Sequence, residues 1–406
     1  MKIALLVPSW PPGFSANGIV TYASQLVPAL RRLGHEVFVL TACKATGDDD
    51  PYTIDLRGFA SPPSLWDRAM FRLALDGATF KAASSAIAAA IIDLSAKHHI
   101  DVFEMEESFG WSFEISRPKL LPVIVRLHGP WFLTGKFADP SEVIVFGARR
   151  EKQEGKGLRH ADFVTSPSAK LLQMVGEHYG RSLRSSRVTP NPLDAAAEAE
   201  TWNAQTCRKE SLLFIGRFDK LKGGAYVLRS FAELAPRYPK LTLTFVGPDI
   251  GIEEAGGKRY KFEEFVRAVV PEACRSRIHF RGQINRSDVM ALRSKHFITV
   301  VASQQEIMPY SVLEAMSLGC PVIATDVGGI PELIEDERNG LLVPPRDVGA
   351  MTAACLKLLD NHEVAAQLGR QAWRDCGDRH APVSIARQTV AVYEEAIDLF
   401  KFRKRH

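Results

Sequence analysis

The segment "HFITVVASQQEIMPYSVLEAMSLGCPVIATD" (residues 296–326) carries the pattern that decides the fold of this chain. It opens with an apolar run, continues through a loop into a helical stretch, and ends in a second apolar run. Such runs are typical of strands buried on both faces, and an intervening helix is typical of a right-handed crossover in a parallel sheet. The segment therefore predicts a strand–helix–strand unit of a doubly wound α/β domain.

Pro309 divides this segment into a loop and a helix. Proline is unfavourable inside a helix but is accepted just before or at its start. We therefore expect Glu306 on the loop and Glu314 in the first turn of a helix that begins near Ser311. Because "SVLE" (311–314) also matches a capping box, Glu314 is interpreted either as a capping residue or as a ligand-binding residue.

The same alternation of apolar runs and helical stretches extends over the whole chain in two series. A Pro-rich connection near residues 192–208 separates them. We predict two doubly wound, Rossmann-like domains, residues 1–195 and 196–384, that face a central cleft at the carboxyl ends of their strands. The amphipathic C-terminal helix, about 385–406, is expected to return to the N-terminal domain.

Composition limits the classes of protein that the chain can belong to. With 46% hydrophobic and 24% charged residues in 406, the sequence is typical of a globular protein of two or three domains. A net charge of +4 is far below that of nucleic-acid-binding proteins. Six cysteines without a C-x-x-C pair argue against a zinc site and favour a reducing cytoplasm. No apolar stretch approaches the ~20 residues of a membrane span.

Basic stretches leave a peripheral membrane contact open. They are residues 149–160, "RSLRSSR" (181–187) and the mixed aromatic and basic "LWDRAMFRLAL" (65–75). Such stretches are compatible with an anionic bilayer, and also with a solvated face or ordinary core packing.

Two loops are candidates for binding phosphate. In "PSWPPGFSANGIVTY" (8–22), Gly13 and Gly18 precede a helix, whose N-terminus attracts anions. In "FIGRFDKLKGG" (214–224), Arg217 and Lys222 stand just past a strand end. Fixed cations at that position either meet an anion such as a diphosphate or remain solvated.

Other motifs are excluded or undecided. The sequence contains neither G-x-G-x-x-G after a strand nor a P-loop, which argues against a dinucleotide oxidoreductase and a P-loop enzyme. The acidic run "DDD" (48–50) lies in a turn composition and is interpreted as a solvated turn rather than as a metal site. His128 ends a buried strand and faces the expected cleft, so it is either structural or functional.

Together these stretches resemble the retaining family 4 glycosyltransferases of the GT-B fold. The most specific match is residues 303–343, "SQQEIMPYSVLEAMSLGCPVIATDVGGIPELIEDERNGLLV", which contains the family's E-x7-E signature. Further similarity lies in "GRFDKLKGG", "LGHEVFVLT", "RLHG", "ADFVTSPS" and "NPLD". The similarity spans nearly the whole chain, although residues 45–120 carry no recognised pattern.

The resemblance implies a role for each matching residue. It implies that Glu314 binds ribose hydroxyls, that Glu306 faces the donor sugar, and that Arg217 and Lys222 neutralise the diphosphate. It further implies that His128 lies near the transferred sugar. The remaining residues that the resemblance places at the nucleotide sugar, several of them through backbone atoms, are Gly18, Gln283, Ile284, Met308, Pro309, Tyr310, Ser311 and Val312.

The implied activity is metal-independent, cytoplasmic transfer of a hexose from a UDP- or GDP-sugar to a glycan or lipid-linked acceptor, with retention of configuration and no cofactor. Bacterial polysaccharide or glycolipid synthesis is the expected setting. A nucleotide-sugar epimerase and a non-catalytic partner subunit of the same fold are the alternatives. Where the family commonly has Phe-Gly, this chain has Met308-Pro309, and Asn17-Gly18 replaces a pair of glycines; both departures bear on donor identity.

Overall fold

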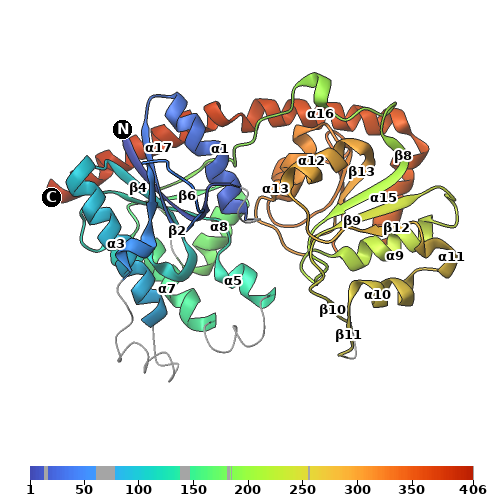
Figure 1. Cartoon of the computed structure of the whole chain (residues 1–406), viewed down its shortest axis with the longest axis horizontal. Helices are drawn as coiled ribbons and strands as arrows, with labels where there is room; N and C mark the ends of the chain where they lie inside the picture. Colours follow the sequence, from blue (N-terminus) through green and yellow to red (C-terminus); the bar gives the residue numbers. More distant parts are fainter. Residues whose placement is uncertain are drawn as a thin grey trace. The chain divides into compact units, whose positions relative to one another are not determined.

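The computed structural model describes residues 1–12, 17–60, 78–137, 147–180, 183, 185–254 and 257–405. They form two compact units (Figure 1). Unit 1 comprises Met1–Pro192 and Pro382–His406, and unit 2 comprises Leu193–Ala381. Sequence patterns predict a boundary after residue 195 and a returning helix from about 385, whereas the chain leaves unit 1 after Pro192 and returns at Pro382.

Unit 1 is built on a seven-stranded sheet in the order β3-β2-β1-β4-β5-β6-β7, parallel at every pairing among the described residues. Its central strands are buried along their length, as the continuous apolar runs predict for a sheet covered on both faces. The strands are β1 (Lys2–Trp10), β2 (Glu36–Lys44), β3 (Thr53–Asp55), β4 (Val102–Glu106), β5 (Val123–Arg126), β6 (Phe163–Ser166) and β7 (Ser186–Val188).

Helices follow the strands of unit 1 as the alternation predicts. The first, α1, begins at an N-cap, Asn17, whose side-chain oxygen accepts a hydrogen bond from the Ile19 N–H at 2.8 Å. The last, α17, packs against α1 and so belongs to unit 1, as expected. The described helices are α1 (Gly18–Arg32), α3 (Ala78–His98), α4 (Ser112–Ser116), α5 (Trp131–Thr134), α7 (Ala148–His160), α8 (Ala169–His178) and α17 (Pro382–Arg405).

A buried polar network joins α17 to the centre of the unit 1 sheet. The hydroxyls of Tyr22 and Tyr393 donate to the two carboxylate oxygens of Glu104, at 2.8 and 3.0 Å. The Arg126 guanidinium lies 4.1 Å from the centre of the Tyr22 ring and donates to the Asn191 side chain at 2.9 Å. Because buried polar groups must be paired, this network fixes the position of α17 on the sheet.

Unit 2 repeats the architecture with a six-stranded parallel sheet in the order β12-β9-β8-β13-β14-β15. A separate antiparallel pair, β10 (Ile252–Glu253) and β11 (Arg259–Tyr260), follows β9. The sheet strands are β8 (Arg208–Ile215), β9 (Thr242–Val246), β12 (Ile278–Phe280), β13 (His296–Val301), β14 (Val322–Thr325) and β15 (Leu341–Val343).

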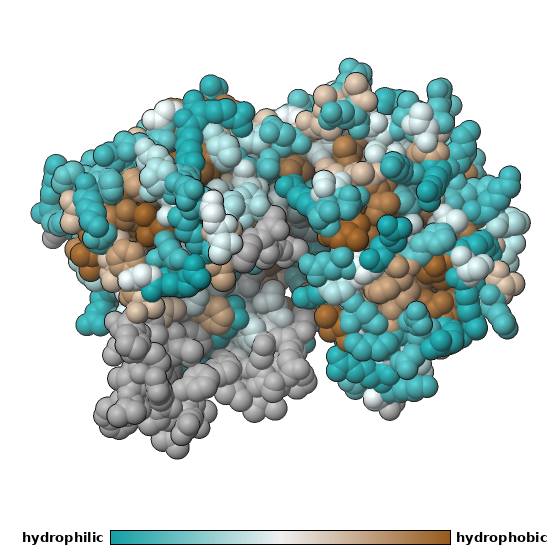
Figure 2. All heavy atoms as spheres, viewed as in Figure 1, coloured by the Kyte–Doolittle hydropathy of each residue, from teal (hydrophilic) through white to brown (hydrophobic). Residues whose placement is uncertain are grey.

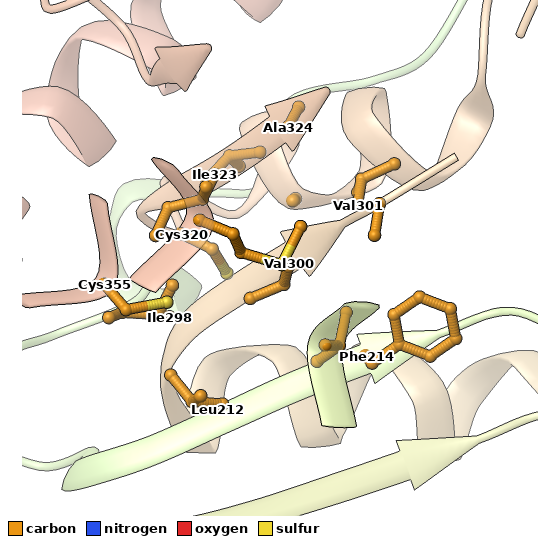
Figure 3. Packing of buried hydrophobic residues seen from close by; sticks show 14 of the residues in the cluster. Leu212, Phe214, Ile298, Val300, Val301, Cys320, Ile323, Ala324 and Cys355 are labelled. Atoms are coloured by element: carbon orange, nitrogen blue, oxygen red, sulfur yellow. The ribbon is translucent and has the colours of Figure 1, made fainter. Parts of the chain in front are cut away.

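Helices and apolar side chains complete unit 2. Figure 3 shows part of its core, where Leu212 and Phe214 of β8 lie near Ile298 and Val300 of β13. The crossover predicted for residues 296–326 is confirmed, because β13 pairs in parallel with β14. The helices are α9 (Gly224–Leu234), α10 (Phe262–Val269), α11 (Glu272–Arg275), α12 (Arg286–Lys295), α13 (Tyr310–Ser317), α14 (Ile330–Leu333), α15 (Val348–Asp360) and α16 (His362–His380).

Hydrophilic side chains cover much of the visible face of each unit in Figure 2. In the described part of the chain, no helix has the combination of length and apolar character that a bilayer crossing requires. The segment 65–75, singled out as a mixed aromatic and basic stretch, lies outside the described residues, as do Gly13 and parts of 181–187.

Candidate functional site

The loops after β8 and β13 meet at the carboxyl edge of the unit 2 sheet. These strands are neighbours, and the Gln304 N–H donates to the Leu221 carbonyl at 2.7 Å, which joins the two loops directly. Gly223 has φ +69°, and a Cβ there would lie 1.9 Å from the Ala302 carbonyl oxygen. Only glycine allows this approach, so the edge is assembled by a contact that no other residue could make.

Lys222 and Glu306, predicted from separate motifs, lie together at this edge. The Lys222 ammonium donates to Glu306 Oε1 at 2.5 Å, and the Ser303 hydroxyl donates to the same oxygen at 2.7 Å. The Glu306 side chain is only 11% exposed. The Oε1 atom is therefore held by a cation and a hydroxyl, and little of the side chain is exposed.

Asp219 organises the two predicted cations. Its carboxylate accepts from Arg217 Nε at 2.6 Å and from the Lys222 backbone N–H at 2.7 Å. The Arg217 side chain remains 49% exposed, so its guanidinium is still available to an anion. Sequence reasoning missed Asp219, although an aspartate inside "RFDK" has the short side chain that commonly accepts from the backbone of its own turn.

Helix α13 corrects the expected helix start. It begins at Tyr310 with Pro309 in the cap position, and no side chain caps it. The Val312 N–H donates to the Pro309 carbonyl at 3.2 Å, whereas the Ser311 N–H lies in the first turn, where no intrahelical acceptor exists. The capping-box interpretation of Ser311 and Glu314 is wrong, because proline fixes the start one residue earlier and Glu314 falls in the second turn.

The Glu314 carboxylate contacts two arginines of α12 instead. Arg286 Nε donates to Oε1 at 3.1 Å and Arg293 Nη2 donates to Oε2 at 3.3 Å. Arg293 is fully buried, whereas the Arg286 side chain is 43% exposed. Neither arginine was singled out in the sequence, although their spacing of seven residues puts both on one face of a helix.

The other residues expected at the nucleotide sugar are distributed around the same edge. Met308 is buried in the unit 2 core, so its side chain is not available to a ligand. Gln283 is exposed and Ile284 half-buried, in the loop between β12 and α12. Gly328, with φ +57°, packs so tightly that a Cβ there would lie 1.7 Å from the Glu306 carbonyl oxygen.

His128 follows β5 at the carboxyl edge of the unit 1 sheet. The carboxylate of Glu107 accepts from the backbone N–H groups of His128 and Gly129, at 2.9 and 2.5 Å. Burial, and then the nearby Arg126 charge, lower the pKa of His128 well below its usual value, so the imidazole is neutral at pH 7. Its ring meets the edge of Tyr22, with ring centres 5.4 Å apart.

Buried carboxylates surround the backbone of this loop, and none was predicted from the sequence. Glu154 accepts from the Trp131 N–H at 2.7 Å and from Arg150 Nε at 2.9 Å, and Glu106 accepts from the Ser108 hydroxyl. Burial is the first cause of a raised pKa for Glu106, Glu107 and Glu154. For Glu107, burial together with the Glu154 and Glu106 charges raises the pKa to about 8.

The remaining sequence candidates are placed as follows. Gly18 is the first residue of α1, directly after the Asn17 cap. In the acidic run, Asp50 pairs with Arg31 at 3.1 Å and accepts from the Tyr52 N–H at 2.9 Å, which makes the run a hydrogen-bonded turn. Within the described ranges, no three His, Cys, Asp or Glu side chains are grouped so that they could hold a metal ion.

Glu107 is expected to make stability fall as pH rises. The folded-state pKa of about 8 lies above the ordinary value of 4.5. The contribution of Glu107 to the free energy of unfolding is therefore complete below about pH 4.5 and is lost as pH rises through 8. Glu107→Gln should therefore reduce the slope of the unfolding free energy against pH by on the order of 1 kcal/mol per pH unit. Urea unfolding between pH 5 and 9 measures it.

The control for this prediction is Glu114→Gln, at a side chain that is 51% exposed and should leave the slope unchanged. Glu106 and Glu154 act in the same direction, so the slope in Glu107→Gln should shrink rather than vanish. Identical slopes for the wild type and Glu107→Gln would contradict the raised pKa.

Comparison with known proteins covers both units. The family model described as "Glycosyltransferase Family 4" matches residues 16–197, and the one described as "Glycosyl transferases group 1" matches residues 209–361. The glycogen synthase of Mycobacterium tuberculosis (strain ATCC 25618 / H37Rv) is 25% identical over 236 residues, which are 58% of this chain and 55% of that protein. The chain spans about half the length of the first curated relatives that it matches.

Solved structures show the same fold. The sucrose-phosphate synthase of Thermosynechococcus elongatus superposes with a TM-score of 0.73 at 23% identity, over 97% of this chain and 98% of that one. HepE from Anabaena in complex with UDP superposes with a TM-score of 0.67 at 16% identity, over 97% and 100% of the two chains. Given the family models that match both halves and the shared fold, the chain belongs to glycosyltransferase family 4 and has the GT-B fold.

Proposed function

We propose that this protein is a retaining, metal-independent glycosyltransferase that moves a hexose from a UDP- or GDP-sugar to a glycan or lipid-linked acceptor. We assign it to the cytoplasm and to bacterial polysaccharide or glycolipid synthesis. One observation carries the proposal: Arg217, Lys222 and Glu306 gather beside the start of α13 at the carboxyl edge of the unit 2 sheet. Open α/β sheets bind ligands at this edge.

The charges at this edge suit a nucleoside diphosphate leaving group. Breaking the bond between a sugar and a diphosphate leaves negative charge on the phosphate, and preorganised cations stabilise that charge. Arg217 is half exposed and held by Asp219, so it can meet the phosphate without rearrangement. Lys222 and the Ser311 N–H at the start of α13 are further donors for the same anion. With these donors, the reaction requires no metal to neutralise the diphosphate.

The same contacts favour retention without a covalent intermediate. Retaining glycosidases use one carboxylate as a nucleophile and another as acid and base. Here the Glu306 carboxylate is bound by Lys222 and Ser303, and the Glu314 carboxylate by two arginines. Neither is an uncommitted nucleophile, so we infer that the acceptor attacks from the face of departure and the leaving phosphate takes its proton. His128 is neutral, so its imidazole can donate one hydrogen bond and accept another, as a sugar hydroxyl requires.

Donor identity is tested by thermal shift with UDP- and GDP-linked hexoses. Anabaena HepE, which shares the fold, has been solved with UDP, and this favours UDP here. A ligand that binds only the folded protein stabilises it, by about 2.7 kcal/mol at 100 times its dissociation constant. We expect a melting-temperature rise with one of the two nucleotide classes. No shift with any nucleotide sugar would favour a non-catalytic subunit.

Arg217→Ala should lower turnover by about two to three orders of magnitude, because one lost donor to a developing anion costs ~3–4 kcal/mol. The measurement is steady-state kinetics with the donor found in the thermal-shift screen. Lys220→Ala is the matched control, since Lys220 is an exposed cation three residues away and should be dispensable. An unchanged rate in Arg217→Ala would remove this residue from the site.

The proposal also includes a peripheral contact of the protein with an anionic membrane. It is supported by α7, on which Lys152, Arg159 and His160 are exposed. Each basic side chain near an anionic surface contributes about 1 kcal/mol, and salt screens the attraction. We expect co-sedimentation with phosphatidylglycerol vesicles at low salt that is lost at high salt and weakened by Lys152→Glu with Arg159→Glu. Absence of low-salt binding would argue against the contact.

A further inference from the structure

Helix α12 presents two arginines to one carboxylate of α13. Arg286 lies in its first turn and Arg293 near its end, and both side chains reach Glu314. The two arginines differ in environment, because the Arg293 side chain is 0% exposed whereas that of Arg286 is 43% exposed. The Glu314 side chain, at 13% exposure, lies between these extremes. One carboxylate oxygen is thus tied to the interior, and the other is paired with an exposed side chain.

Glu314 is the counter-ion of the buried Arg293 guanidinium. Among the described residues, Glu314 is the only carboxylate within ion-pair distance of Arg293, and the Arg293 Nε and Nη1 atoms are buried without a partner. Its backbone carbonyl accepts from the Cys320 thiol at 3.5 Å, which ties this end of α12 to the loop before β14. A buried guanidinium is costly unless its counter-charge is present, so the pair with Arg293 fixes the direction of the Glu314 carboxylate.

Arg286, in contrast to the buried Arg293, is partly exposed to solvent. Its pair with Glu314 is exposed, and exposed ion pairs contribute little to stability. A ligand hydroxyl can therefore share or replace Arg286 at Oε1 while Arg293 still holds Oε2. Two vicinal hydroxyls are a matching partner for a carboxylate with this geometry, because each can donate a charge-assisted hydrogen bond.

We propose that Arg293 is a positioning residue that aims the Glu314 carboxylate at the ribose of the nucleotide and thereby gives the site its selectivity for ribonucleotides over nucleotides without ribose hydroxyls. This inference rests on the proposed function, which brings a UDP- or GDP-sugar to this edge of unit 2, and on the family resemblance, which implies that the ribose meets Glu314. A purely structural pair would stabilise unit 2 in the same way but would leave ribose selectivity unchanged. The two roles therefore differ in a measurable ligand preference.

The test measures dissociation constants by calorimetry for UDP, GDP and the 2′,3′-dideoxy form of each. The variants are Arg293→Met, which replaces the guanidinium with an apolar chain, Glu314→Gln, and the two combined. Thermal unfolding of each variant is recorded in parallel. Arg237→Met is the control, because Arg237 forms a surface pair with Asp360 in the same unit, with side chains 61% and 51% exposed.

The wild type should bind its ribonucleotide about 100-fold more tightly than the dideoxy form, as expected for two hydrogen bonds to a charged group. Arg293→Met should reduce this ratio to less than about 10-fold while remaining folded, because Glu314 keeps Arg286 and solvent. Glu314→Gln should lower the melting temperature by about 10 °C, since it leaves Arg293 unpaired. The double variant should regain most of that temperature without regaining selectivity.

Three results would overturn the inference and leave the proposed function in place. An Arg293→Met protein that keeps the wild-type ratio would show that Arg293 only packs. A double variant as unstable as Glu314→Gln would show that the unpaired Arg293 charge is not what destabilises the single variant. Equal affinity of the wild type for the ribo and dideoxy forms would show that the ribose hydroxyls do not bind to Glu314. A wild type that binds neither UDP nor GDP would instead overturn the proposed function, and the inference with it.

Discussion

Two glycines hold the loop that carries Glu306, and the rest of the candidate site depends on this constraint. Gly223 lets the loop after β8 approach the Ala302 carbonyl, and Gly328 lets the loop after β14 approach the Glu306 carbonyl. A Cβ at either position would collide with backbone, which cannot move aside as a flexible side chain can. Because Lys222 precedes Gly223 directly, the same approach brings its ammonium to the Glu306 carboxylate.

The two units differ in how their carboxylates are paired with cations. In unit 2, each carboxylate at the candidate site has a cation within hydrogen-bonding distance: Asp219 with Arg217, Glu306 with Lys222, and Glu314 with two arginines. In unit 1, Glu106 and Glu154 of the buried cluster share the Arg150 charge, whereas Glu107 is held by the backbone N–H groups of His128 and Gly129. Burial with too little counter-charge raises the pKa values of these carboxylates, which makes the loop around His128 sensitive to pH.

Tertiary packing also explains why the chain's last helix belongs to unit 1. An amphipathic pattern shows that a helix docks somewhere but does not identify the surface that receives it. Tyr393 fixes the docking surface of α17, because its hydroxyl donates to the buried Glu104 carboxylate in the middle of the sheet. That carboxylate is shared with Tyr22 of α1, so both helices are fixed by one group. Burial raises the pKa of Glu104, and the Arg126 charge and the two tyrosine hydroxyls act against this shift.

The sequence by itself determined the alternation of strands and helices, the division into two sheets and the family. These follow from local periodicity and contiguous motifs, and the structure has the two parallel sheets that the alternation predicts. The resemblance to the family also assigned Arg217, Lys222 and Glu306 to one ligand, and the structure places their loops side by side because β8 and β13 are neighbours. Only the tertiary structure decided the partners of Glu314, the start of α13 at Tyr310 and the carboxylates behind His128. The helix start follows from the adjacent Pro309, whereas the partners of Glu314 and the carboxylates behind His128 come from other elements of the chain, and no local pattern records which of these groups meet.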